Sequence, residues 1–140
     1  FLKLFQNRAD VPIITRYLIG PDWRQMNTKD RDFAISQVGK YLAKKYGSQF
    51  SYFTDSKFNI KKVIEKKPGT YFLIDTQVNH KREGEFMIQW RLGTKSGEPR
   101  LVDIVIEGIS MLATEKVEIQ ARIDKNKGSN KIRKAMEKIY

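Results

Sequence analysis

Few side chains in this sequence could carry catalysis. Its single histidine, His80, is followed by the charged residues 81–83, and the absence of cysteine excludes a thiol nucleophile and a thiolate metal site. Residues 80–83 have the composition of a hairpin turn, so we expect His80 to be solvated rather than to act as a base or a ligand. A serine–histidine–aspartate triad would need His80 to reach Ser36 or Ser110, and no spacing in the sequence indicates this.

Carboxylate chemistry is equally sparse. A metal site with one histidine and no cysteine would have to be built from carboxylates, and the sequence has no calcium-loop pattern. Asp103 and Glu107 lie four residues apart, which separates them by about 13 Å along an extended strand, too far for a catalytic carboxylate pair. We therefore predict no catalytic residue, no metal site and a protein that is not an enzyme.

The clearest change of pattern lies in residues 100–123. The first half alternates as a half-buried strand does, with apolar residues on one side at Val102, Ile104 and Ile106. Glu107 and Gly108 then predict a structural corner, where a carboxylate can accept backbone amides. After Ser110, a suitable helix cap, the spacing becomes helical. The predicted inner face of this helix consists of Leu112, Lys116, Ile119 and Ile123.

Two helices are predicted before the sheet. Asp10 is the expected cap of the first, which Gly20 and Pro21 end. Thr28 is the expected cap of the second, which is about 25 residues long. Its apolar stripe consists of Ala34, Val38, Tyr41, Leu42, Tyr46, Phe50 and Phe53. Residues 1–7 are compatible with the last turns of a longer helix, and we expect a further N-terminal portion, such as a signal peptide, upstream of them.

Alternating segments between these helices and the C-terminus predict an antiparallel meander of four strands. The expected strands are residues 58–65, 70–79, 86–92 and 100–106, with turn residues between them. A helix over 112–125 and a short amphipathic helix from residue 132 follow. The predicted fold class is α+β, with a curved sheet covered on one face by helices around a hydrophobic cavity or a dry core.

The length and the charge narrow the possible functions. A chain of 140 residues suits a single domain, residues 1–140, and no apolar run approaches the roughly 20 residues that cross a bilayer. The net charge of +11 makes the surface attractive to anionic lipids, acidic proteins or nucleic acid, and charge alone does not choose between them. For most of the scattered basic pairs we expect a solvated face.

Three motifs carry a resemblance to a known family. They are DVPIITRYLIGPDWR over 10–24, with Asp10, Arg16, Gly20 and Trp23 in the family's positions, YLAKKYG over 41–47, and DIVIEGISM over 103–111. In this order and spacing the sequence resembles the MlaC family of toluene tolerance or phospholipid-transport proteins of the Gram-negative periplasm. It departs from the family pattern in its missing N-terminal portion and its basic C-terminal tail.

The resemblance implies a nuclear transport factor 2-like fold with a deep cavity for phospholipid tails, and no cofactor other than phospholipid as cargo. The implied function is that of a soluble periplasmic carrier. It would shuttle lipid between an outer-membrane lipoprotein complex and an inner-membrane ABC transporter complex, with transient membrane-surface contact, and so maintain outer-membrane lipid asymmetry. Some relatives are associated with hopanoids, so the lipid is not fixed by family membership.

The expected lining of this cavity follows from the direction in which side chains face in the predicted elements. It is not taken over from lipid contacts known in the family. The predicted lipid-binding residues are Ile13, Tyr17, Trp23, Val38, Leu42, Phe72, Ile74, Phe86, Ile88, Trp90, Ile104, Ile106, Leu112 and Ile119. For Trp23, a packing role is an alternative to pocket lining. For Glu107 with Gly108, direct contact with a lipid headgroup is the alternative to a structural corner.

Two other functions remain open at this point. A basic nucleic-acid-binding module would explain the charge and the aromatic residues, but the sequence has no recognised motif of that class and its aromatic residues alternate toward the interior, so we predict no nucleic-acid partner. A small enzyme of the same general fold would need at least two polar side chains that converge inside the cavity.

Overall fold

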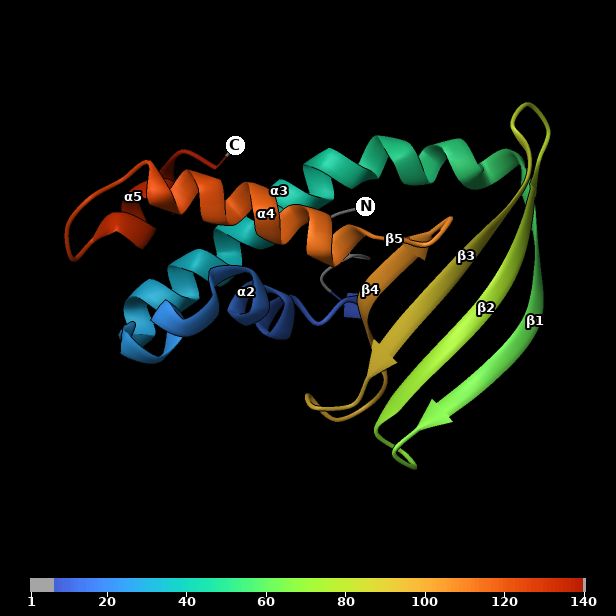
Figure 1. The fold of residues 1–140 in the computed structure, drawn as a ribbon, viewed down its shortest axis with the longest axis horizontal. Helices are drawn as coiled ribbons and strands as arrows, with labels where there is room; N and C mark the ends of the chain where they lie inside the picture. The colour runs from blue at the N-terminus through green and yellow to red at the C-terminus, as the bar shows by residue number, and fades with distance from the viewer. Residues whose placement is uncertain (1–6, 140) are drawn as a thin grey trace.

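The chain folds as an α+β structure with an open antiparallel sheet (Figure 1). A computed structural model describes residues 7–139, with all side chains in that range except those of residues 50–52 and 54. The predicted helix over residues 1–7 therefore lies outside the described residues, apart from Asn7. In chain order the elements are α2 (Val11–Ile19), the 3₁₀ helix η1 (Gly20–Gln25), α3 (Thr28–Tyr52), the 3₁₀ helix η2 (Phe53–Asp55), β1 (Ser56–Lys66), β2 (Tyr71–His80), β3 (Gly84–Gly93), β4 (Arg100–Ile106), β5 (Ile109–Ser110), α4 (Met111–Asp124) and α5 (Lys131–Glu137).

Asp10 fixes the start of α2, as predicted. Its Oδ1 accepts a hydrogen bond of 3.2 Å from the Ile13 amide, and Pro12 occupies the first turn, where a missing amide costs nothing. The same residue joins α2 to the sheet, because its amide donates to the Leu101 carbonyl at 2.9 Å and its Oδ2 accepts from the Ser96 hydroxyl at 2.7 Å. This buried carboxylate thus ties α2 to β4 and to the loop before it.

α3 has the predicted length of 25 residues, but its cap is Asn27 rather than Thr28. Oδ1 of Asn27 accepts from the Asp30 amide at 2.8 Å, and its carbonyl accepts from the Arg31 amide at 3.0 Å. Asparagine and threonine are both good caps, so two adjacent candidates leave a one-residue ambiguity in the sequence. The Phe50 side chain of the predicted stripe lies outside the described residues.

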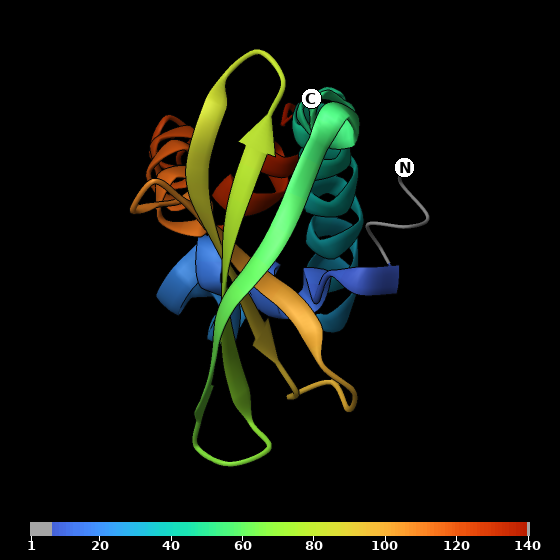
Figure 2. The same ribbon diagram turned by 90° about the vertical axis from the view of Figure 1, so that its right-hand side faces the viewer.

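The sheet confirms the predicted meander. Its strand order is β1-β2-β3-β4-β5, with each neighbour antiparallel. The fifth strand, which the sequence did not indicate, is the two-residue β5 that pairs Ile109 with Ile106 and Ser110 with Val105. All the helices labelled in Figure 1 lie to one side of the sheet, and the turned view in Figure 2 shows them behind the strands. Helix-to-sheet contacts are made mainly by α2 and α4 against β4.

The corner between β4 and β5 is structural, as expected. Glu107 and Gly108 have positive φ angles of 48° and 80°, a conformation that glycine adopts freely and that costs a glutamate about 1–3 kcal/mol. Two hydrogen bonds to Met87 of β3 offset this cost: the Glu107 amide donates to the Met87 carbonyl at 3.0 Å, and Glu107 Oε1 accepts from the Met87 amide at 2.7 Å.

Two polar residues start α4. Ser110 Oγ accepts from the Ala113 amide at 3.0 Å, which confirms the predicted cap. The buried Asp103 of β4 accepts from the Leu112 amide at 2.9 Å and from the Ser110 hydroxyl at 2.6 Å. A carboxylate at a helix N-terminus is favoured by the helix dipole, so Asp103 joins α4 to the strand that precedes it.

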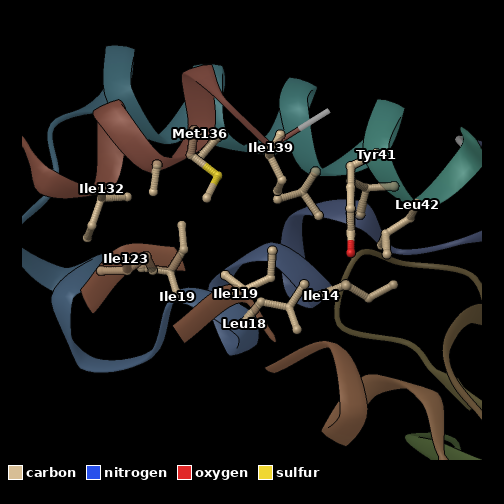
Figure 3. Packing of buried hydrophobic residues seen from close by; sticks show 14 of the residues in the cluster. Ile14, Leu18, Ile19, Tyr41, Leu42, Ile119, Ile123, Ile132, Met136 and Ile139 are labelled. Atoms are coloured by element: carbon tan, nitrogen blue, oxygen red, sulfur yellow. The ribbon is translucent and has the colours of Figure 1, made fainter. Parts of the chain in front are cut away.

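The main hydrophobic core lies among the helices (Figure 3). Its fully buried members include Leu18 of α2, Val38 of α3, Ile119 of α4 and Met136 of α5. α5 docks on α3 through its apolar side, and Gln37 donates a hydrogen bond of 2.9 Å to the Met136 carbonyl. No helix within residues 7–139 is both long enough and apolar enough to span a bilayer.

The prediction for His80 was wrong. The side chain is buried, and its Nδ1 accepts hydrogen bonds from the amides of Arg82 and Glu83 at 3.0 and 3.1 Å. The imidazole therefore caps the β2–β3 turn as an Asn or Asp side chain commonly does. Composition identified the turn correctly but could not show that the imidazole folds back over it.

Candidate functional site

One face of the sheet is apolar across four strands. Directly paired residues of antiparallel strands point to the same side, so the register places Ile74, Trp90 and Ile104 in one row and Phe58, Val78 and Phe86 in another. The apolar face comprises Phe58, Ile60, Val63, Phe72, Ile74, Val78, Phe86, Ile88, Trp90, Leu92, Ile104 and Ile106.

The polar group at the centre of this face is satisfied within the sheet. The Thr76 hydroxyl donates to the Ile88 carbonyl at 2.8 Å and accepts from the Trp90 indole at 3.0 Å. The indole and the hydroxyl thus use their polar atoms on each other, and the ring of Trp90 adds apolar area to the face. An apolar ligand would therefore find no unsatisfied polar group at this point.

Cover over the apolar face decreases toward β1. Ile88 is 1% exposed, whereas Phe58, Ile60 and Val63 on β1 are 44%, 68% and 59% exposed. Phe53 of η2 packs on Phe58 and Phe86, with ring centroids 6.3 and 5.9 Å apart. The face therefore runs from a buried centre to an open apolar edge on β1. Contiguous exposed apolar surface of this kind commonly marks a binding site.

A small apolar cavity lies where β4 meets the helices. Its volume is about 60 Å³, and its apolar lining comes from α2, α3, α4 and β4. The main lining residues are Ile14, Leu18, Leu42, Leu101, Ile104 and Leu112. Ligand pockets are typically about 300–1,000 Å³, so a lipid could enter this region only if the helices and the sheet moved apart.

A polar cluster joins α3 to α4 at the edge of this cavity. The buried Glu115 accepts hydrogen bonds from the Tyr46 hydroxyl at 2.5 Å and the Tyr41 hydroxyl at 3.0 Å, and its Oε1 lies 2.7 Å from the Lys45 ammonium. Lys45 also pairs with Glu118 at 3.1 Å. Figure 3 shows Tyr41 and Leu42 pointing from α3 toward Ile14 of α2, so the polar cluster lies next to apolar packing.

Tyr41, Tyr46 and Lys45 of this cluster each keep one protonation state around neutral pH. Burial, reinforced by the hydrogen bond to Glu115, raises the pKa of Tyr46, and burial also raises the pKa of Tyr41. For Lys45, burial alone would lower the pKa, but hydrogen bonds to Glu115 and Glu118 outweigh burial and raise it. Lys45 is therefore an ammonium and both tyrosines are neutral. The hydrogen bonds and the ion pair of this cluster join α3 to α4.

Two grooves lie outside the cavity, along α2. One, of about 240 Å³, runs between α2 and the end of the sheet and has mostly apolar walls, including Ile13, Tyr17 and Tyr71. The other, of about 530 Å³, continues along α2 and η1 and has basic residues at its walls. The two grooves share Ile13, Tyr17 and Lys95.

The structure distributes the predicted lipid-binding residues over several places. The apolar sheet face carries Phe72, Ile74, Phe86, Ile88, Trp90, Ile104 and Ile106. The small apolar cavity is lined by Leu42, Ile104 and Leu112, and the grooves by Ile13, Tyr17, Trp23 and Leu112. Val38 and Ile119 are fully buried in the helical core. A role in lipid binding stays a prediction for all of them.

Sequence reasoning missed Glu115. A helical face that contains Leu112 and Ile119 can include either residue 115 or residue 116 between them, and the predicted face had Lys116. The structure buries Glu115 instead, while Lys116 donates to the Tyr17 carbonyl at 3.1 Å. Charge gives no preference between the two positions. Tyr41 and Tyr46 of α3, whose hydroxyls can donate to a buried carboxylate, were the one signal that favoured Glu115.

Trp23 is a packing residue in this structure as well as a groove residue. It packs against the helical core, and the Arg31 guanidinium lies 5.1 Å from its ring centroid while donating to the Trp23 carbonyl at 3.1 and 2.8 Å.

Within residues 7–139, no three His, Asp or Glu side chains are grouped closely enough to hold a metal ion. The described residues therefore form apolar surfaces with polar residues at their edges.

Comparisons with known proteins agree with this architecture. The chain is similar in structure to the phospholipid-binding protein from Ralstonia solanacearum, solved in complex with a phospholipid, with a TM-score of 0.80 and 18% identity over 96% of this chain and 75% of that chain. At that identity the likeness shows a shared fold. No curated protein matches the sequence. The family described as MlaC protein matches residues 1–138, and the chain therefore belongs to the MlaC family.

Proposed function

We propose that this protein is a periplasmic carrier that holds the acyl chains of a phospholipid against the apolar face of its sheet. The observation that carries the proposal is that this face continues from the small apolar cavity, through Ile104, to the exposed residues Phe58 and Ile60. The related Ralstonia protein, described as phospholipid-binding, supports the class of ligand.

Transfer energetics suit a carrier with these properties. Removing one methylene from water is worth about 0.8 kcal/mol, so an apolar lining alone suffices to keep acyl chains out of water. The same chains are already out of water in a bilayer, so their transfer between the bilayer and the protein should change the free energy little in either direction. A protein of this kind needs no energy source of its own, and docking to its partners would decide the direction of transport.

Loading requires a conformational change. The cavity of about 60 Å³ is much smaller than a diacyl lipid, so α3 would have to move relative to the sheet. α2 and α4 make the main helix contacts with β4, and the β1 side of the apolar face is open. Separation of the helices from β1–β3 would therefore leave the attachment at β4 intact.

The proposed partners of the carrier are two membrane protein complexes. Family membership supports shuttling between an outer-membrane lipoprotein complex and an inner-membrane ABC transporter complex, and hence a role in outer-membrane lipid asymmetry. The net charge of +11 would speed encounters with acidic protein or lipid surfaces within a Debye length of about 8 Å. A hopanoid is the alternative cargo for the apolar face, and identification of the bound lipid decides between the two.

The proposal is tested on protein purified under mild conditions. Native mass spectrometry with organic extraction should find a co-purifying diacyl lipid at about one per chain, as expected for one site that excludes water. A co-purifying hopanoid would change the cargo and keep the carrier. Repeated absence of lipid, with no uptake from phosphatidylglycerol vesicles, would refute the carrier.

A nucleic-acid-binding role is tested in parallel because the charge is high. Binding to random oligonucleotides that weakens steeply with salt would favour it. Trp90 and Phe86 point to the inner face of the sheet, which leaves them poorly placed to stack on bases. We therefore expect no such binding at physiological ionic strength.

A further inference from the structure

The groove of about 530 Å³ along α2 combines strong positive charge with aromatic walls. Its lining includes Arg16, Tyr17, Trp23, Arg24, Lys95 and Lys116. None of the described residues that line it is a carboxylate. Asp22, which adjoins the groove in sequence, forms an ion pair with Lys131 of α5 at 3.4 Å. Four cations therefore surround this groove without an acidic partner on its walls, which makes it attractive to an anion.

Contacts among three segments hold the groove in shape. Lys116 of α4 donates to the Tyr17 carbonyl at 3.1 Å, and its ammonium lies 4.2 Å from the centroid of the Tyr17 ring. Gln120 donates to the carbonyls of Leu18 and Ile19 at 2.8 and 2.7 Å, so α4 is fixed against the last turn of α2. The loop that carries Lys95 is attached to α2 through the hydrogen bond between Ser96 and Asp10.

The lining residues become more polar from the small apolar cavity toward this groove. The small apolar cavity and the neighbouring apolar groove share Ile14, Val102 and Leu112, which lie between them. The apolar groove in turn shares Tyr17 and Lys95 with the basic groove. Tyr17 is 44% exposed and presents an apolar ring with a polar tip at this boundary, as tyrosines do between acyl chains and headgroups.

We propose that the basic groove binds the phosphate of a lipid whose acyl chains extend through the apolar groove toward the cavity and the sheet. This inference rests on the proposed carrier function and specifies its cargo. Arginine and lysine bind phosphate oxygens through charge-assisted hydrogen bonds. The groove thus selects diacyl lipids that carry a phosphate over diacylglycerol with the same chains, and over hopanoids.

The test replaces exposed cations that make no described side-chain contact within the fold. The triple variant Arg16→Gln, Arg24→Gln, Lys95→Gln removes three charges from the groove, and all three side chains are exposed. The matched control, Lys57→Gln, Lys61→Gln, Lys62→Gln, removes three exposed charges from β1, away from the groove. Both variants therefore change the net charge equally and should keep the fold, which circular dichroism and urea unfolding check.

Each protein is incubated with vesicles of phosphatidylglycerol that contain a minor fraction of diacylglycerol with identical chains, and is then re-isolated. Mass spectrometry gives the total lipid per chain and the ratio of the two lipids. We expect wild type and control to be enriched in phosphatidylglycerol relative to the vesicles. In the groove variant the ratio should fall roughly tenfold, because the loss of each exposed charge contact weakens phosphate binding by only a few-fold. The total lipid per chain should stay the same.

The outcomes separate the two levels of the proposal. An unchanged ratio with normal total lipid overturns the phosphate site and leaves the carrier. An equal fall of both lipids, or the same change in the β1 control, also overturns the phosphate site. No lipid in the wild type refutes the carrier itself.

Two further measurements on wild type and groove variant identify the source of the phosphate. Inorganic phosphate alone should bind far more weakly than the lipid, as seen by titration of backbone amide signals. Equal affinity for free phosphate would overturn the lipid assignment, and so would binding of a random oligonucleotide that the groove variant loses.

Discussion

The ammonium of Lys45 on α3 lies 2.7 Å from Oε1 of Glu115 on α4, and this ion pair sits at the edge of the cavity between the two helices. Glu115 is buried, and it also accepts hydrogen bonds from Tyr41 and Tyr46. Two helices that are far apart in sequence are thus joined by a charged group in an otherwise apolar region. A buried charge of this kind is tolerated only while its partners stay in place.

Replacing Glu115 by glutamine should destabilise the fold. The amide cannot neutralise Lys45, and it offers one oxygen acceptor to the two tyrosine hydroxyls instead of two. We expect Glu115→Gln to lower the free energy of unfolding by about 2–3 kcal/mol, measured by urea denaturation. Glu118→Gln is the matched control, because the Glu118 side chain is 48% exposed, and it should cost less than about 0.5 kcal/mol. Equal effects of the two substitutions would contradict the role of Glu115.

Stability should fall at high pH. The raised pKa of Tyr46 means that the unfolded chain loses this proton as the pH passes the ordinary value of 10.0, while the folded chain keeps it. The unfolded state then binds fewer protons than the folded state. The free energy of unfolding therefore has its full value below pH 10.0 and declines above it. Lys45, with its raised pKa, acts in the same direction above its ordinary value of 10.5.

The check on this pH dependence is urea unfolding of wild type and Tyr46→Phe at neutral pH and above pH 10.5. The variant should lose less stability between the two conditions, since one of the groups whose pKa is raised in this cluster is absent. An identical decline in both proteins would show that the α3–α4 cluster does not control alkaline stability.

Much of the fold was predictable because local patterns decided it. Alternation in the run Phe86 to Leu92 gave β3, and the Asp10 and Ser110 caps gave the starts of α2 and α4. Where two neighbouring residues fit equally well, local pattern failed, as with Asn27 and Thr28. The short strand β5 was missed since two residues carry no period.

The site was predictable only in part, because it depends on tertiary placement. Alternation identified the apolar side of each strand, yet it could not show that Ile88 is covered while Ile60 on the same face is open. The basic groove combines residues as distant as Arg16, Lys95 and Lys116, and no sequence interval connects them. The attachment of the β3–β4 loop and of α4 to α2 brings these charges together.

The buried imidazole of His80 should contribute to the stability of the β2–β3 turn. His80→Ala removes the acceptor for two backbone amides and should lower the free energy of unfolding by about 1–2 kcal/mol in urea denaturation. His80→Asn should recover part of this loss, because asparagine side chains accept the same kind of turn hydrogen bond. If the asparagine variant is no more stable than the alanine variant, the imidazole acts through packing rather than as a turn cap.

Neighbouring residues of β4 allow a direct test of the apolar face. Ile106 and Val105 are both half-buried, but Ile106 shares the apolar face with Ile88, whereas Val105 pairs with Gln89 on the other side. A carboxylate on an apolar binding surface costs several kcal/mol, so Ile106→Glu should lower the lipid recovered per chain at least about tenfold. Val105→Glu, checked for equal folding by circular dichroism, should carry lipid as the wild type does, because its charge faces away from the acyl chains. Equal lipid content in the two variants would mean that the acyl chains do not lie on this face of the sheet.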